Sequence, residues 1–562
     1  MIKKIITIVV AILLMIIVLF VGFKLGIIEK YSYSDKKADL NEYFQIYGSD
    51  EVPIILQDQL VEEKAVFYED MYYMSYESTL KYVNNRFYYD NVEQQVLYTT
   101  PTDIIKTAVG SKQYTVSESP VDESYTIAIS KNDTVYIAID FLKKFTNLSY
   151  ETFETPKRMQ LFTEWGTVQT AVIKKNTSVR YQGGVKSEVL TDIIKGTKVV
   201  VLEEMETWTK VKTEDGFIGY VENKRLTDFA SETRVPVTEY VEPEYTSIKK
   251  DKKINLVWNM TTNAESNENA FKLLDSTKGV NVISPTWYSL SDNMGNITSI
   301  ADLDYVNKMH ERGVEVWALV DNFSQDVSTY DVLTPTSSRT NLISQLISNV
   351  LSYGIDGINV DFESVPAEAG YAYVEFIREL SVACRNNGIV LSIDNPTPYD
   401  FNAHYNLKEQ GIVADYVIIM GYDEHVPASE EVGSSASIDF VEQGIVNTVA
   451  AVPQEKVINA IPFFALVWTN SEEVPTEKKT MKALQAFLTE NAIETTWDEV
   501  TCQNYARTSV DDVLYEVWVE DQKSIETKLN IMSNYQLAGV ASWRLGQETP
   551  DIWDVIEAYL NK

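Results

Sequence analysis

The hydrophobic positions after residue 250 fall into eight short apolar runs, most of them separated by stretches with a helical pattern. Continuous apolar runs of this length are typical of parallel strands that are covered on both faces. Eight β/α units within roughly 310 residues predict a (β/α)8 TIM barrel. The runs are Ile254–Trp258, Val280–Ser284, Val314–Val320, Gly357–Phe362, Ile389–Asp394, Tyr416–Met420, Val457–Ile461 and Gly539–Trp543.

The remaining pattern predicts a multidomain chain. The long interval 467–537 predicts an α+β insertion in the barrel, including residues 514–519. Upstream of the barrel region (250–562), we expect an α+β N-terminal domain at 40–165, a small all-β barrel at 167–228, and a linker at 229–249. The strands of the all-β module are short and separated by turns that contain glycine, as at Glu214-Asp215-Gly216.

The first 30 residues predict a membrane anchor. Ile5 to Phe23 are 19 residues without a charge, close to the roughly 20 that span a bilayer as a helix. Lys3 and Lys4 precede this stretch, which favours a cytoplasmic N-terminus and an extracellular remainder. The alternative is a cleaved signal peptide, although residues 23–26 contain no small-x-small cleavage site.

Charge and composition exclude several function classes. The chain has 48 Lys and Arg against 82 Asp and Glu, a net charge of −34, which argues against a nucleic-acid partner. The three histidines lie far apart in sequence, and the two cysteines, Cys384 and Cys502, cannot form a four-thiolate site. We therefore expect no metal and no cofactor. The cysteines either form one bridge or remain separate thiols, and buried thiols are favoured.

The fourth apolar run carries the candidate chemistry. Alternation along a strand places Asn359, Asp361 and Glu363 on one face and Ile358, Val360 and Phe362 on the other. Because burying carboxylates without partners is costly, these polar groups should gather at the open C-terminal mouth of the barrel, where barrel enzymes have their active sites. The alternative is a half-exposed strand with a solvated polar face.

These residues resemble a known catalytic motif. Residues 356–363 are similar to the D-G-x-D-x-D-x-E motif of family 18 glycoside hydrolases, with Asn359 in place of the middle Asp. The Asn form is typical of the spore-cortex-lytic branch. Residues 420–423 resemble the family's M-x-Y-D motif, and Trp543 ends the eighth run. The resemblance covers residues 250–562.

The resemblance implies substrate-assisted retaining catalysis, in which the 2-acetamido oxygen of the sugar replaces an enzyme nucleophile. Glu363 would be the general acid and then the base, Asp361 would bind the acetamido N–H, and Tyr422 would donate to the acetamido oxygen. Because Asn359 cannot ionise, we expect a less strongly raised pKa for Asp361 and an altered acidic limb of the pH profile.

Further candidates for substrate binding lie in the motifs and near strand ends. Aromatic faces bury the apolar faces of sugar rings, and Trp543 is the candidate floor of the N-acetyl sugar subsite. Ordinary core packing is the alternative for the other aromatics. The candidates are Asp356, Asn359, Met420, Asp423, Trp543, Trp258, Trp317 and Asp394.

Two upstream modules also show resemblances. Residues 195–202, 208–213 and 214–221 resemble the bacterial SH3-like family, which implies binding to wall peptide or glycan, with a plain spacer as the alternative. The strand, short helix, strand order of residues 133–162 resembles the amine-oxidase-type N-terminal domain of exported wall proteins, which implies a stalk or binding module.

The combined hypothesis is a membrane-anchored extracellular glycoside hydrolase. Its expected partners are the membrane and a polysaccharide that contains N-acetylglucosamine, namely peptidoglycan. The alternatives are a chitinase acting on chitin oligomers, a non-catalytic sugar-binding wall protein, and a scaffold for wall assembly.

Overall fold

The computed structural model describes residues 2–24, 26, 30–236, 238–471 and 473–562. The chain divides into two compact units. The first, here called the N-terminal unit, comprises residues 1–87, 107–114 and 121–242. The second, the barrel unit, comprises residues 88–106, 115–120 and 243–562.

The N-terminal unit begins with the helix α1 (Ile2–Lys24). A stretch of 18 residues within Lys3–Lys24 has a mean hydropathy of 3.4, and none of it is buried against the protein. The helix is long and apolar enough to cross a membrane or to serve as a signal sequence.

Within the described part of the N-terminal unit, seven strands form a mixed sheet in the order β11-β12-β1-β2-β3-β10-β9. The short helices α4 (Tyr76–Tyr82) and α5 (Ile139–Leu142) accompany it. The strands are β1 (Glu51–Leu56), β2 (Gln59–Tyr68), β3 (Met71–Ser75), β9 (Ala128–Lys131), β10 (Thr134–Ala138), β11 (Ser149–Glu154) and β12 (Lys157–Phe162).

A second sheet of the described N-terminal residues, in the order β15-β14-β18-β17-β16-β13-β19, contains the predicted small all-β module. Gly216, at a φ of +85°, makes the expected hairpin between β17 and β18. Strand β19 continues to Thr233, so the first residues of the expected linker form a strand instead. The strands are β13 (Thr167–Ile173), β14 (Thr177–Arg180), β15 (Val189–Ile193), β16 (Lys198–Glu204), β17 (Trp208–Lys212), β18 (Ile218–Glu222) and β19 (Leu226–Thr233).

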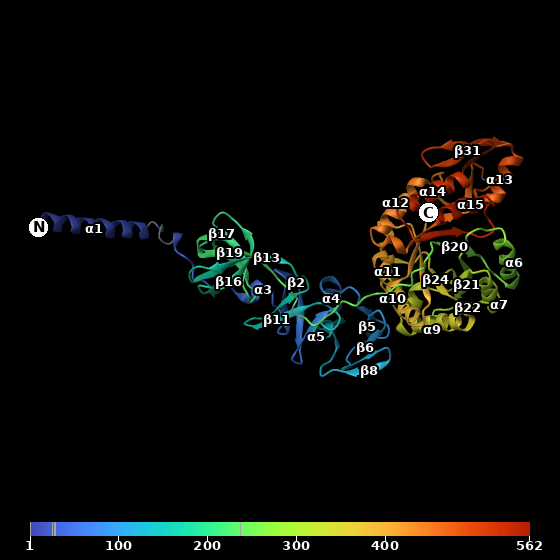
Figure 1. Cartoon of the computed structure of the whole chain (residues 1–562). Coiled ribbons are helices and arrows are strands. Elements are labelled where there is room, and N and C mark those ends of the chain that lie inside the picture. The colour runs from blue at the N-terminus through green and yellow to red at the C-terminus, as the bar shows by residue number, and fades with distance from the viewer. Residues whose placement is uncertain (1, 25, 27–29, 237, 472) are drawn as a thin grey trace. The chain divides into compact units, whose positions relative to one another are not determined.

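In the described part of the barrel unit, eight parallel strands close into a barrel, which confirms the predicted fold (Figure 1). Each apolar run of the sequence overlaps one of these strands. They are β20 (Ile254–Asn259), β21 (Val282–Leu290), β23 (Glu315–Asp321), β24 (Gly357–Asp361), β25 (Val390–Pro396), β26 (Tyr416–Met420), β27 (Val457–Pro462) and β33 (Gly539–Trp543).

Helices with one apolar face cover the outside of the barrel. Cys384 is buried in α10, Cys502 is partly exposed, and both are free thiols. The helices are α6 (Ala264–Leu274), α7 (Leu303–Glu311), α8 (Thr329–Leu333), α9 (Thr336–Tyr353), α10 (Gly370–Asn387), α11 (Leu407–Val413), α12 (Ile438–Val449), α14 (Gln522–Asn534) and α15 (Ile552–Leu560).

The predicted insertion lies between β27 and α14 and forms a sheet in the order β29-β28-β32-β31-β30. It has its own small core, which includes Val467, Leu484 and Val517. Its elements are β28 (Phe464–Thr469), β29 (Glu477–Thr480), α13 (Met481–Glu490), β30 (Thr496–Asp498), β31 (Gln503–Val510) and β32 (Val513–Val519).

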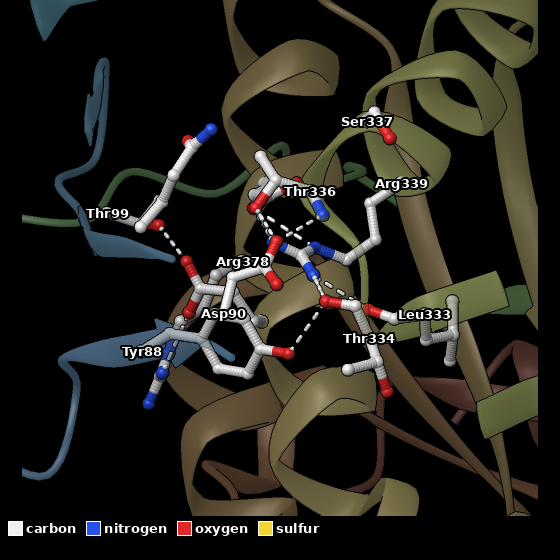
Figure 2. Close-up of polar contacts among 12 residues, drawn as sticks. Tyr88, Asp90, Thr99, Leu333, Thr334, Thr336, Ser337, Arg339 and Arg378 are labelled. Atoms are coloured by element: carbon white, nitrogen blue, oxygen red, sulfur yellow. Dashed lines mark hydrogen bonds and ion pairs between the residues drawn. The ribbon is translucent and has the colours of Figure 1, made fainter. Parts of the chain in front are cut away.

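A hairpin from far upstream belongs to the barrel unit, here called the brace: β4 (Tyr88–Asp90) and β5 (Gln95–Thr99) (Figure 2). Pro335 precedes α9 and gives it no side-chain cap. The fully buried Asp90 supplies one from 246 residues away, because its Oδ2 accepts the N–H and the hydroxyl of Thr336 at 2.7 and 2.6 Å. The sequence pattern did not predict this contact.

Candidate active site

Four carboxyl groups gather at the C-terminal ends of neighbouring barrel strands. Asp321 ends β23, Asp361 ends β24, and the two residues are paired in register. Ile393 of β25 is paired in register with Val360 of β24. Asp394 follows Ile393 as Asp361 follows Val360, so the two aspartates are neighbours on adjacent strands. Glu363 follows β24 by two residues and is exposed, whereas Asp321, Asp361 and Asp394 are buried. This end of the strands is where barrel enzymes have their active sites.

Asn359 is fully buried beneath this cluster and uses its whole hydrogen-bonding capacity. Its Oδ1 accepts the indole N–H of Trp258 and the hydroxyl of Ser284, both at 2.9 Å. Its Nδ2 donates to Ser392 Oγ at 3.1 Å and to Asp394 Oδ1 at 2.8 Å. Asn359 therefore holds the cluster from below.

Asp361 has a strongly raised pKa even though position 359 carries an amide. Burial, followed by the charges of Asp394, Glu363 and Asp321, raises its pKa well above the usual range. Burial also raises the pKa of Asp394 well above its usual range, and the hydrogen bond from Asn359 opposes this. A second carboxyl group thus does act on Asp361, but it comes from β25 and not from position 359.

Glu363 has a raised pKa, as a general acid requires. The first cause is desolvation around its carboxyl, although the residue as a whole is exposed, and the charge of Asp423 adds to it. Lys478 acts in the opposite direction and lowers the pKa. Lys478 comes from β29 in the insertion and pairs with Asp423 at 2.8 and 3.0 Å.

Asn322 holds the backbone of Glu363 and was missed from the sequence. Its Oδ1 accepts the N–H of Glu363, and its Nδ2 donates to the carbonyl of Glu363, both at 2.9 Å. The same Nδ2 donates to Thr329 Oγ1 in α8 at 2.8 Å. The sequence offered one signal for Asn322: it lies just after a predicted barrel strand, as the candidate site residues near the ends of other strands do.

Tyr422 lies two residues beyond β26, with its ring edge against Phe464 at a centroid distance of 5.9 Å. The residue is buried, and burial with the charges of Asp361 and Asp394 raises its pKa well above the usual range. The hydroxyl therefore stays protonated at neutral pH and serves as a hydrogen-bond donor.

The structure places two of the predicted substrate contacts toward the opposite end of the barrel from the carboxyl cluster. Asp356 precedes β24 and accepts the N–H of Val316 at 2.8 Å, with His310 Nε2 also at 2.8 Å. Trp317 pairs with Gly357, the first residue of β24, and stacks on Tyr416 at 5.4 Å. Both residues hold strand beginnings in place.

Three further candidates are buried among protein groups. Asn359 and Asp394 are 0% and 1% exposed, and Trp258 is 1% exposed, so in this conformation none of them presents a surface to a sugar. The ring of Trp258 lies 5.9 Å from that of Trp543, which is partly exposed at the end of β33. Trp543, Asp423 and the partly buried Met420 remain predicted substrate contacts.

The arrangement suits acid–base chemistry on a neutral bond. An exposed carboxyl with a raised pKa lies at the mouth, next to a buried carboxyl and a protonated tyrosine hydroxyl. Among the described residues, no group of three or more His, Cys, Asp or Glu side chains could hold a metal ion.

Comparisons with known proteins agree with this chemistry. The model of the glycosyl hydrolases family 18 matches residues 257–548, and that of the bacterial SH3 domain matches residues 175–227. The "Uncharacterized glycosylase YvbX" of Bacillus subtilis (strain 168) is 24% identical over 290 residues, 49% of this chain and 84% of that protein.

A second relative is the "Cortical fragment-lytic enzyme" of Bacillus anthracis, 24% identical over 246 residues, 42% of this chain and 56% of that protein. A solved chitinase from Chromobacterium violaceum ATCC 12472 shares the fold, with a TM-score of 0.50 and 23% identity, covering 55% of this chain and 99% of that one. With more than half of its residues matched by the family model, the chain belongs to the glycosyl hydrolases family 18 and is a glycosidase.

Proposed function

We propose that this glycosidase cleaves the β-linked N-acetylglucosamine glycan of peptidoglycan by substrate-assisted retaining catalysis. The observation that carries the proposal is the position of Glu363, with its raised pKa, at the mouth of the barrel above the buried Asp361 and close to Tyr422.

Each group has a defined part in the proposed reaction. Glu363 protonates the leaving glycosidic oxygen while the 2-acetamido oxygen of the same sugar attacks the anomeric carbon. Asp361 accepts the acetamido N–H and stabilises the oxazolinium charge, and Tyr422 donates to the acetamido oxygen. Glu363 then takes a proton from the attacking water, which restores the acid and retains the β configuration.

Two observations favour the cell wall as the place of action. The Bacillus anthracis relative is named as cortical fragment-lytic, and this chain spans 56% of its length. The bacterial SH3 module and the apolar helix α1 suit a protein held at the membrane with its barrel outside the cell. We therefore propose a single-span anchor at residues 1–30.

The test is product analysis with the full chain in detergent, on purified peptidoglycan and on chitin oligosaccharides. We expect new N-acetylglucosamine reducing ends from peptidoglycan by mass spectrometry, released as the β anomer in proton NMR. Muramic acid reducing ends, or release of the α anomer, would contradict the proposal. Cleavage of chitin oligosaccharides alone would make the chain a chitinase.

Asn322→Ala should lower kcat on peptidoglycan by about 100-fold with little change in KM, because a small displacement of the acid weakens proton transfer more than it weakens binding. The matched control is Asn387→Ala, an exposed residue at the end of α10, which should keep wild-type kinetics. If Asn322→Ala instead lowers kcat and raises KM by the same factor, Asn322 contacts the substrate and does not position Glu363.

Lys478→Met should move the alkaline limb of the kcat/KM profile to higher pH. Lys478 lowers the pKa of Glu363, so its removal raises that pKa, and the acid stays protonated to higher pH. The neighbouring Lys479→Met is the control, because Lys479 pairs with Glu477. A limb that stays in place or moves to lower pH would rule out the assignment of Glu363 as the acid.

A further inference from the structure

Asp361 and Asp394 are two buried carboxyl groups on adjacent strands, and each has one oxygen with no hydrogen-bond partner among the described residues. These oxygens are Asp361 Oδ1 and Asp394 Oδ2. Two ionised carboxylates buried side by side repel each other strongly, so such pairs hold a proton between them.

The network of Asn359 defines which oxygen of Asp394 is available. The indole N–H of Trp258 can only donate, so the Asn359 atom that faces it must be the amide oxygen. The amide nitrogen therefore faces Asp394 and donates to its Oδ1. Asp394 Oδ2 is left as the atom that can carry a proton toward Asp361.

Other titratable groups around the pair add no positive charge to it. The carboxyls of Glu363 and Asp321 act on Asp361 and raise its pKa. Three tyrosines face the same cluster: Tyr422 after β26, Tyr373 in α10, and Tyr405 before α11, and the pKa of each is raised by burial and by these carboxyls. A proton within the pair is therefore the available source of neutralisation.

We propose that Asp394 is a positioning residue that shares one proton with Asp361, and so supplies from β25 the second carboxyl that position 359 lacks. The inference rests on the proposed function for its role in the reaction. In the resting state the proton lies between the two carboxyls. When the acetamido N–H binds and the oxazolinium charge forms, the proton moves fully to Asp394 Oδ2, and Asp361 becomes the carboxylate that faces the sugar. This step only moves one proton between two carboxyl groups, so atoms and charge balance.

The kinetic test is the pH profile of Asp394→Asn and of the exchanged double variant Asn359→Asp/Asp394→Asn, made in the full chain. Asp394→Asn should lower kcat by about 100-fold, because the carboxylate is no longer formed in step with the intermediate. The acidic limb of the kcat profile of Asp394→Asn should move to higher pH. In the wild type, the shared proton stabilises the singly ionised pair of carboxyl groups, and the amide of the variant stabilises the Asp361 carboxylate less well. The double variant restores a carboxyl pair and should return the limb toward the wild-type position.

Ser392→Ala separates proton sharing from a merely structural role. It removes another partner of Asn359 without changing any carboxyl, so it should keep the wild-type acidic limb. An unchanged limb in Asp394→Asn, or a double variant that behaves like the single one, would overturn the inference.

Infrared difference spectra between wild type and Asp394→Asn, taken at neutral pH without substrate, read the proton directly. The wild-type band of a protonated carboxyl should disappear in the variant, and its persistence would overturn the inference. This measurement needs no turnover. If the band disappears in Asp394→Asn but the wild-type protein cleaves no glycan, the shared proton is supported and the proposed function is refuted.

Discussion

Glu363→Gln should lower kcat on peptidoglycan by about 1,000-fold, the scale of a lost general acid–base group. Glutamine keeps the shape of the side chain but can neither give a proton to the leaving oxygen nor take one from water. Both halves of the proposed reaction need this group, so the loss should appear in formation and in breakdown of the intermediate.

The measurement is steady-state release of N-acetylglucosamine reducing ends, with binding to peptidoglycan followed separately. Glu368→Gln, an exposed residue five positions along the same loop, is the matched control and should keep wild-type rates. A Glu363→Gln variant that binds glycan normally but no longer cleaves it would also exclude the non-catalytic sugar-binding alternative. Retention of a tenth or more of wild-type kcat would refute the assigned acid.

Arg339→Ala should lower the free energy of unfolding of the barrel unit by about 3–5 kcal/mol, the cost of leaving a buried charge alone. Arg339 is 0% exposed, and its Nη2 donates to Glu379 Oε1 at 2.9 Å. Its Nη1 donates to the carbonyls of Leu333 and Thr334 at the end of α8, at 2.7 and 2.8 Å (Figure 2). Its removal therefore leaves both a carboxylate and two carbonyls without this donor.

The measurement is the urea midpoint by tryptophan fluorescence, which follows the barrel unit because eight of the ten tryptophans lie there. The control Arg507→Ala removes an exposed guanidinium whose Nε lies 3.6 Å from the partly buried Glu516, and it should cost less than about 1 kcal/mol. Replacing Arg339 and Glu379 together by Met should recover most of the loss. An Arg339→Ala variant as stable as Arg507→Ala would show that the buried pair of Arg339 and Glu379 contributes little to stability.

Local pattern was enough to predict the barrel, the insertion and the strand that carries the candidate acid. Each barrel strand is a mostly apolar run, and residues 359–363 depart from this pattern by placing three polar side chains on one face. The same pattern does not give the height of a residue along the barrel axis, which is why Trp317 and Asp356 were predicted as substrate contacts although they lie toward the opposite end of the barrel.

Local pattern does not show which distant segments come into contact, and for Asn322 and Asp394 it gave no more than a place near a strand end. Asn322 directly follows β23 and Asp394 lies in β25, both outside the motif, and their neighbours are brought to them only by the closed barrel. Asp90 lies in a stretch that reads as an upstream module, yet it is buried against a helix of the barrel unit.

The brace also determines where the gene can be cut. A fragment that begins at the linker, or at residue 257 where the family match starts, would lose Asp90 and begin α9 without its cap. It would also leave Glu375 in α10, which accepts the hydroxyl of Thr99 at 2.8 Å, facing solvent without that partner. A transplantable catalytic cassette of this enzyme must therefore carry residues 88–106 with it, by an unbroken chain or by co-expression of the missing piece.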